Sequence, residues 1–187
     1  MLVFQNTSCQ KDYSYEGGDT VTVIRNPGID SLPAPSPGTM KFLPDCSFCH
    51  STDNLSVGMW SFESGNSYAC GGTTNSGFFG GYSKMDITFF GPSSCSGDTG
   101  LVMSVFLPVP LDHDRSNITA DRAAFYYYDN NAPKDIFDSQ AERPFKVTVE
   151  NFNISTGIAV GTFSGTVFKA NGDTAVIKNG RYKILIK

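Results

Sequence analysis

The C-terminal third of the chain alternates apolar and polar residues, a period of two that predicts β-strands. In PFKVTVENF the apolar residues Phe145, Val147 and Val149 share one face. The runs VGTFSGTVFKA, DTAVIK and RYKILIK follow, separated by Asn171-Gly172 and Asn179-Gly180. Asn-Gly between alternating runs is typical of a tight hairpin turn, because both turn residues need positive φ. We therefore expect an antiparallel hairpin meander at the end of the chain.

Shorter runs with the same period precede this block. VGMWSFES places Trp60 and Phe62 on one face, and SKMDITFFGP, GLVMSVFLP and AAFYYYDNN end in Gly, Pro or Asn turn signals. The pattern predicts seven to nine short strands and no long helix. We expect an all-β fold, an antiparallel β-sandwich or a partly open barrel, that ends in the hairpin meander.

The first forty residues have a different character. Four prolines lie between Asn26 and Gly38, together with Ser and Gly. Prolines at this density exclude a helix or a central strand and favour a semi-extended spacer. We therefore divide the chain into residues 1–40, a leader and Pro-rich tether, and residues 41–187, the β domain.

Length and charge narrow the function classes. A chain of 187 residues is long enough for one domain with a proper core. The net charge of −4, without a cluster of Lys or Arg, does not favour nucleic acid as a partner. No apolar run of about eighteen residues occurs, so the sequence predicts no membrane-spanning helix.

Catalytic signals are weak in this sequence. The two histidines, His50 and His113, have no recognisable nucleophile motif beside them. In GTFSG, Ser164 lies one place late for Gly-x-Ser-x-Gly, and within a predicted strand rather than at a strand-to-helix turn. We therefore expect a protein that is not an enzyme.

Five cysteines occur, at positions 9, 46, 49, 70 and 95. Within DCSFCH, Cys46, Cys49 and His50 have the Cys-x-x-Cys-His spacing that holds haem c through two thioethers and an axial imidazole. Most small haem c proteins carry this motif on a helix, whereas here a proline precedes it and STDN follows. Haem would also leave Cys70 and Cys95 without a role.

Two other chemistries use the same thiols. Cys46, Cys49, Cys70 and Cys95 could form a Cys₄ zinc site, although structural zinc usually takes its ligands as two close pairs and only one is present. Structural disulfides, typical of oxidising compartments, give all four thiols a role. The segments 70–72 and 94–96 have the composition of loops that such bonds hold in place. We expect two disulfides, with three possible pairings left open.

The N-terminal segment SCQKDYSYEGG resembles the start of surface lipoproteins of Bacteroidetes-type bacteria, in which a small residue precedes the lipid-bearing cysteine. The resemblance implies lipidation of Cys9, with residues 10–12 similar to a surface-export signal. A complete signal peptide has a basic start and roughly 7–15 apolar residues. Only residues 1–4 precede the polar stretch here, so we interpret the leader as truncated.

The C-terminal block GTFSGTVFKANGDTAVIKNGRYKILIK resembles the closing segment of uncharacterised Bacteroidetes surface lipoproteins. This second resemblance carries no known catalytic residue, and it implies location and fold only. Together, the two resemblances imply a lipid-anchored protein of the outer membrane, on the cell surface or facing the periplasm.

One loop has a partial calcium pattern. LDHDRSN brings together four oxygen-bearing residues at spacings that can hold Ca²⁺, namely Asp112, Asp114, Ser116 and Asn117. The Gly and distal Glu of an EF-hand loop are absent, so a solvated loop is the simpler interpretation.

The segment FYYYD is the strongest candidate for ligand binding. In a strand, Phe125 and Tyr127 share one face while Tyr126 and Tyr128 share the other. One face must pack inward, and the other offers two tyrosines that could stack on a sugar or on a partner's side chain. The alternative is that a loop such as NSGFFGGYS covers the second pair.

These observations give two hypotheses of different classes. The first is a non-catalytic, lipid-anchored module of the cell envelope that binds a glycan or a protein and needs no cofactor. The second is a periplasmic electron carrier with haem c at Cys46, Cys49 and His50.

Overall fold

The computed structural model describes residues 46, 49, 54–79, 83–131, 136–139 and 144–187, which belong to one structural unit, Thr39–Lys187. Within these residues the regular structure consists of eleven β-strands, more than the seven to nine predicted. The strands are β1 (Met59–Ser64), β2 (Ser67–Gly72), β3 (Asn75–Phe78), β4 (Asp86–Pro92), β5 (Thr99–Phe106), β6 (Arg115–Thr119), β7 (Arg122–Asp129), β8 (Phe137–Asp138), β9 (Phe145–Asn153), β10 (Ile158–Lys169) and β11 (Thr174–Leu185).

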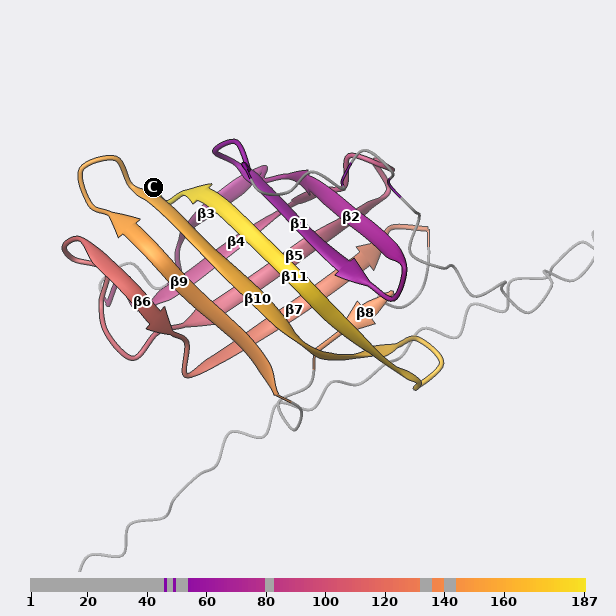
Figure 1. Cartoon of the computed structure of the whole chain (residues 1–187). Helices are drawn as coiled ribbons and strands as arrows, with labels where there is room; N and C mark the ends of the chain where they lie inside the picture. Colours follow the sequence, from indigo (N-terminus) through magenta and orange to yellow (C-terminus); the bar gives the residue numbers. More distant parts are fainter. Residues whose placement is uncertain (1–45, 47–48, 50–53, 80–82, 132–135, 140–143) are drawn as a thin grey trace, which may run out of the picture. The chain divides into compact units, whose positions relative to one another are not determined.

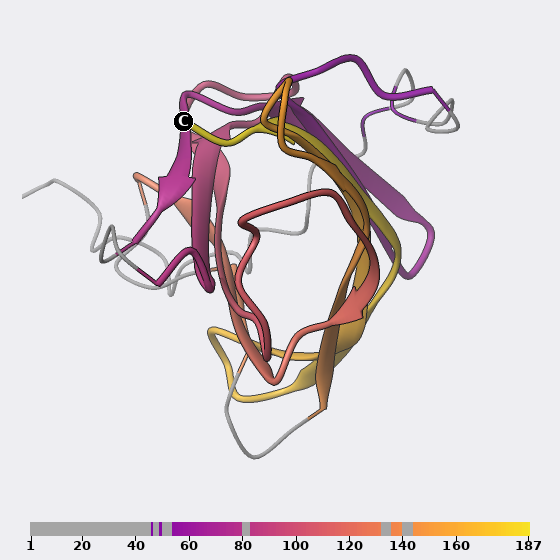
Figure 2. The ribbon, with the colours of Figure 1, turned by 90° about the vertical axis from the view of Figure 1, so that its left-hand side faces the viewer.

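The strands form one antiparallel sheet in the order β2-β1-β11-β10-β8-β7-β5-β4-β3, and β9 pairs with both β10 and β6. This sheet curls so that β1, β11, β10 and β9 lie in front of β3, β4, β5 and β7 (Figure 1). Viewed from the side, the strands surround a common interior (Figure 2). The all-β prediction is confirmed, in the form of a half-barrel.

The ends of the curled sheet approach one another. Gly71 in β2 forms an isolated antiparallel bridge with Ser93, which follows β4. Ser76 in β3 donates a hydrogen bond from its hydroxyl to the carbonyl of Leu185 in β11, at 2.6 Å. Both contacts join segments distant in the strand order, so they hold the sheet in its curled form.

The C-terminal meander is confirmed, with one correction. Strands β9, β10 and β11 are antiparallel neighbours, and Asn171-Gly172 lies in the turn between β10 and β11. Asn179-Gly180 is not a hairpin turn, however, because β11 runs through it from Thr174 to Leu185.

Asn179 and Gly180 instead form a β-bulge. The register of β11 against both β10 and β1 shifts at this point, and Asn179 has a φ of 49°. Its side-chain amide donates to Glu63 Oε2 at 3.0 Å. A Cβ on Gly180 would collide with the ring and the carbonyl oxygen of Phe163. The positive φ of Asn179 and the missing side chain of Gly180, which predicted a hairpin turn, are therefore features of a bulge within the strand.

The inward residues of the sheet make an aromatic core. Trp60 and Phe62 share one face of β1, as the alternation predicted, and this face is fully buried and contacts rings from β7 and β10. Val147 and Val149 are likewise buried, with Phe145 packed against the core. The largest fully buried side chains are Trp60, Tyr127, Tyr182, Phe62, Phe89, Phe125 and Phe152.

The segment 70–72, expected in a loop, is the end of strand β2. Its glycines pair with Trp60 and Met59 of β1, and the indole of Trp60 occupies the space where a Cβ on Gly71 would lie. The indole nitrogen also donates to the carbonyl of Gly72 at 3.3 Å. Segment 94–96 does lie in a connection, between β4 and β5, as predicted.

Candidate functional site

Strand β7 divides its aromatic residues between the two faces of the sheet. Phe125 and Tyr127 point inward and are fully buried, and the Tyr127 hydroxyl donates to Thr99 Oγ1 at 3.2 Å. Burial raises the pKa of Tyr127, so its ring remains a neutral part of the core. Tyr126 points outward with 36% of its surface exposed, and Tyr128 is partly exposed on the same face.

Tyr126 belongs to an apolar row that crosses three strands. Phe90 in β4 pairs with Val102 in β5, and Val102 pairs with Tyr126 in β7. Phe90 is 39% exposed, and the three side chains share the outer face. Because adjacent strands lie about 4.8 Å apart, the first and last members of the row are separated by roughly 10 Å. That separation is comparable to the length of a disaccharide.

Tyr128 extends this row sideways. It pairs with Gly100 of β5, and its ring and hydroxyl occupy the space in which a Cβ on Gly100 would lie. Gly100 is buried, with the Tyr128 ring and the carbonyl oxygen of Gly91 beside it. We call the surface formed by Phe90, Val102, Tyr126 and Tyr128 the aromatic face.

Polar and charged residues border the aromatic face. Thr88 and Ser104, two residues along β4 and β5 from Phe90 and Val102, share a hydrogen bond of 3.1 Å between their hydroxyls. Four residues beyond Val102 and Tyr126 along β5 and β7, the Arg122 guanidinium lies 4.5 Å from the centre of the Phe106 ring. An apolar centre with hydroxyl groups at its edge can stack on an uncharged ring and hydrogen-bond its substituents.

The sequence identified Tyr126 and Tyr128 but missed Phe90 and Val102. A usable signal was present in the pair Phe89-Phe90, because consecutive residues of a strand point to opposite faces. Phe89 is fully buried, so Phe90 must lie outside. The register that places Phe90 in line with Tyr126 is a property of the pairing of three strands, which the alternation within one strand does not contain.

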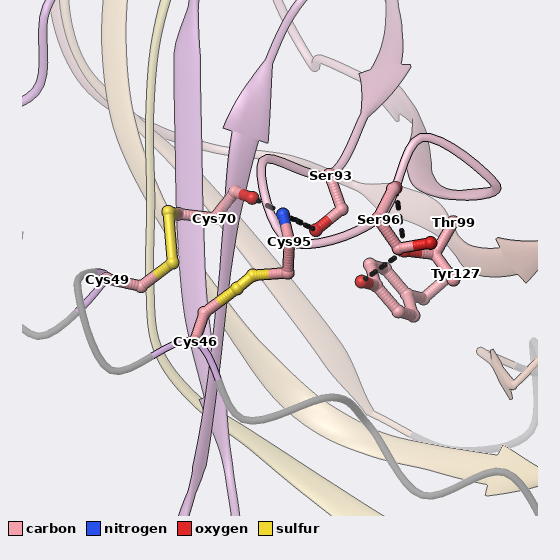
Figure 3. Close-up of a disulfide and its surroundings, with 8 residues drawn as sticks. All are labelled: Cys46, Cys49, Cys70, Ser93, Cys95, Ser96, Thr99 and Tyr127. Carbon is pink, nitrogen blue, oxygen red and sulfur yellow. Dashed lines mark hydrogen bonds between the residues drawn. A yellow bond between two sulfur atoms is a disulfide. The ribbon is translucent and has the colours of Figure 1, made fainter.

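The four cysteines of the β domain lie together. Cys46 is joined to Cys95, with their Cα atoms 5.9 Å apart, and Cys49 is joined to Cys70, with Cα atoms 5.6 Å apart (Figure 3). They connect the chain before β1 to strand β2 and to the β4–β5 connection. The expectation of two disulfides agrees with this arrangement, and one of the three pairings is selected.

A sulfur in a disulfide cannot also form a thioether to haem or ligate zinc as a thiolate. The disulfide assignment and the haem c hypothesis for Cys46 and Cys49 therefore exclude one another in any one molecule. The third residue of that hypothesis, His50, lies outside the described residues, as does the predicted lipidation site Cys9.

The predicted calcium residues lie partly in a strand. Ser116 and Asn117 belong to β6, so the solvated loop predicted for them is wrong from Arg115 onward. Asp112 accepts hydrogen bonds from His113 Nδ1 at 2.7 Å and from Arg115 at 3.4 Å. Asp114 accepts one from the backbone N–H of Ile154 at 2.8 Å. Both carboxylates thus have partners within the protein.

No protein-family profile, curated protein or solved structure matches this chain. Within the described residues, no helix has the length and apolar character needed to cross a bilayer. The assignment of a function therefore rests on the geometry of the aromatic face and on the chemistry of the sequence.

Proposed function

We propose that this protein is a non-catalytic binding module of the cell envelope that recognises a glycan through the aromatic face. The observation that carries the proposal is the row Phe90–Val102–Tyr126, in which two aromatic rings stay exposed on a sheet whose other face is filled. Isolated exposed apolar residues are common on proteins, whereas aligned aromatic ones on a rigid sheet are typical of binding surfaces.

The physical basis is stacking of sugar rings on aromatic rings. A sugar presents C–H groups on one face and hydroxyls around its edge, so it matches an aromatic ring bordered by hydrogen-bonding groups. Phe90 and Tyr126 lie two strands apart, which suits two positions along an extended oligosaccharide. The side-chain hydroxyls of Thr88 and Ser104 and the phenol hydroxyls of the tyrosines can form hydrogen bonds with the sugar hydroxyls.

The envelope location rests on a different part of the chain. The resemblance of SCQKDYSYEGG to the start of surface lipoproteins supports lipid attachment at Cys9 and anchoring in the outer membrane, on the surface or the periplasmic side. Two disulfides in the folded domain suit an oxidising compartment outside the cytoplasm. A module held by a lipid at the end of a Pro-rich tether would face polysaccharides or proteins of the envelope.

A glycan array probed with the purified protein tests the glycan proposal. The wild type should bind a subset of extended oligosaccharides, and Tyr126→Ala and Phe90→Ala should each weaken binding about tenfold, because stacking contributes on the order of 1–1.5 kcal/mol for each ring. Both side chains are partly exposed, so these variants should keep the fold.

Val176→Ala is the matched control. Val176 is an exposed apolar residue, 48% accessible, in β11, a strand that does not contribute to the aromatic face. This variant should bind as the wild type does. Equal signals from the wild type, Tyr126→Ala and Phe90→Ala would contradict a role for the aromatic face.

A further inference from the structure

The cysteine cluster joins four cysteines from three separate segments through two disulfides. Cys46, Cys49 and Cys70 are 2%, 3% and 6% exposed, and Cys95 is packed against them. The sulfurs of Cys46, Cys49 and Cys95 all lie within 4.8 Å of one another. In a tetrahedral Zn–S₄ site with Zn–S bonds of about 2.3 Å, neighbouring sulfurs are roughly 3.8 Å apart. These three sulfurs therefore lie near the spacing of such a site, and Cys70, whose Cα is 5.6 Å from that of Cys49, must move its side chain to supply the fourth sulfur.

The backbone that carries these sulfurs is held by hydrogen bonds of its own. Cys46 donates its N–H to the carbonyl of Tyr68 at 3.2 Å. Ser93 ties the other two segments together, because its hydroxyl donates to the carbonyl of Cys70 and accepts from the N–H of Cys95, at 3.3 and 3.1 Å (Figure 3). These contacts do not depend on sulfur–sulfur bonds, so after reduction they still hold the backbone of Cys46, Cys70 and Cys95. Cys49 is held through the hydrogen bond of its N–H to the carbonyl of Cys46, at 2.8 Å.

A buried hydroxyl lies beside the cluster. Ser61 pairs directly with Cys70 across β1 and β2, which places the two side chains on the same face of the sheet. Ser61 is fully buried, and its Oγ has no hydrogen-bond partner among the described residues. A buried hydroxyl without an acceptor destabilises a fold, and a thiolate on Cys70 would supply the acceptor.

We propose that reduction of the two disulfides converts this cluster into a four-cysteine site for a soft divalent cation, with Zn²⁺ as the expected ion. Each disulfide accepts two electrons and two protons from a dithiol, which is itself oxidised to a disulfide, so two dithiols produce four thiols. Binding of one Zn²⁺ then releases the four thiol protons to solvent. Disulfide bonds and the metal site are alternative ways of closing the same three segments.

The full chain, reduced with a phosphine and desalted without oxygen, tests the proposal. Titration with Co²⁺ should produce thiolate-to-metal charge-transfer absorption, Zn²⁺ should displace the Co²⁺, and native mass spectrometry should show one ion per chain. The oxidised protein should bind neither ion. Binding of equal strength to the oxidised protein would overturn the proposal.

Serine variants identify the ligands. Cys70→Ser and Cys95→Ser should each weaken Zn²⁺ binding at least about tenfold, whereas Cys9→Ser, the same change at the fifth cysteine, should leave it unchanged. Undiminished binding in Cys70→Ser and Cys95→Ser would mean that Cys46 and Cys49 act alone, which would overturn the four-cysteine site.

Trp60 fluorescence distinguishes Zn²⁺ binding by the folded protein from Zn²⁺ binding by an unfolded chain. Trp60 is the protein's single tryptophan and is fully buried, so its emission reports on the core next to the cluster. The zinc-bound protein should keep the emission of the oxidised protein. If Zn²⁺ binds only to protein whose Trp60 emission is that of an unfolded chain, the proposal is overturned.

Ser61→Ala should weaken Zn²⁺ binding severalfold, and wild-type affinity in this variant would refute the role of Ser61.

Discussion

Trp60 lies against Gly71 of the neighbouring strand, and its indole fills the place where any larger residue would put its Cβ. The same Cβ would also collide with the carbonyl oxygen of Pro92. Gly71 thus lets the largest side chain of the core fit beneath β2, at the point where β2 also bridges to Ser93.

We predict that Gly71→Ala lowers the free energy of unfolding by about 1–3 kcal/mol, because overpacking forces the indole or the backbone to move. Denaturant unfolding followed by Trp60 emission measures the change. Gly97→Ala is the control, since a Cβ at Gly97 has no neighbour within 4 Å and this glycine does not have a left-handed φ. Similar stabilities for the two variants would contradict the packing account.

Peptide mapping of the oxidised protein should recover Cys46 linked to Cys95 and Cys49 linked to Cys70. Cleavage after Phe48 separates the first two cysteines, so the three pairings give peptides of different mass. Recovery of a Cys46–Cys49 or Cys46–Cys70 linkage, or four freely alkylated thiols, would refute the pairing.

Removal of each bond should cost stability according to the loop that it closes. The Cys49–Cys70 bond spans 21 residues and the Cys46–Cys95 bond spans 49. The chain-entropy model then predicts losses of about 3 and about 4 kcal/mol for the two double serine variants.

Protein matured in a haem-competent host should show no Soret absorption, because the paired sulfurs cannot form thioethers.

The bulge at Asn179 predicts that a glycine substitution at this position destabilises the protein less than an alanine substitution. A left-handed φ such as the 49° of Asn179 destabilises the folded state by roughly 1–2 kcal/mol for most residues. This cost is smaller for Asn and absent for Gly. Asn179→Ala should therefore destabilise the protein by about 1 kcal/mol, and Asn179→Gly by less, despite losing the same bond to Glu63. Thermal unfolding of the two variants decides this, and a more stable Asn179→Ala would contradict it.

Tyr182 predicts a loss of stability in alkaline solution. Its ring is buried, and burial, with a smaller contribution from the charge of Glu150, raises the pKa of its hydroxyl. The folded state therefore holds the phenol proton more tightly than the unfolded chain, whose tyrosines have a pKa of about 10. The stabilisation is complete below about pH 10 and is lost as the pH rises beyond it.

Tyr182→Phe isolates this effect. At neutral pH the variant should be about 1 kcal/mol less stable, because it loses the hydrogen bond from the tyrosine hydroxyl to the carbonyl of Thr148, 3.2 Å long. Between pH 9 and pH 11 its free energy of unfolding should fall less steeply than that of the wild type. Parallel curves from denaturant titrations would contradict the assignment.

The sequence predicted what local alternation determines. It placed Trp60 and Phe62 on one face and Tyr126 on the face opposite Tyr127, because side chains on a strand alternate whatever the strand pairs with. It failed where a residue has a role set by a distant strand. The sequence predicted Gly71 in a loop because the packing of Trp60 against it depends on another strand. The alignment of Phe90 with Tyr126 likewise depends on strand pairing, which no local pattern contains.

The pairing of β1 with β11 affects how the protein folds. Met59 lies opposite Lys183, so β1 is joined both to β2, its neighbour in sequence, and to β11, the last described strand. Contacts between residues so distant in sequence form slowly during folding. Until they form, the facing edges of β1 and β11 are unpaired, and chaperones and proteases can reach them.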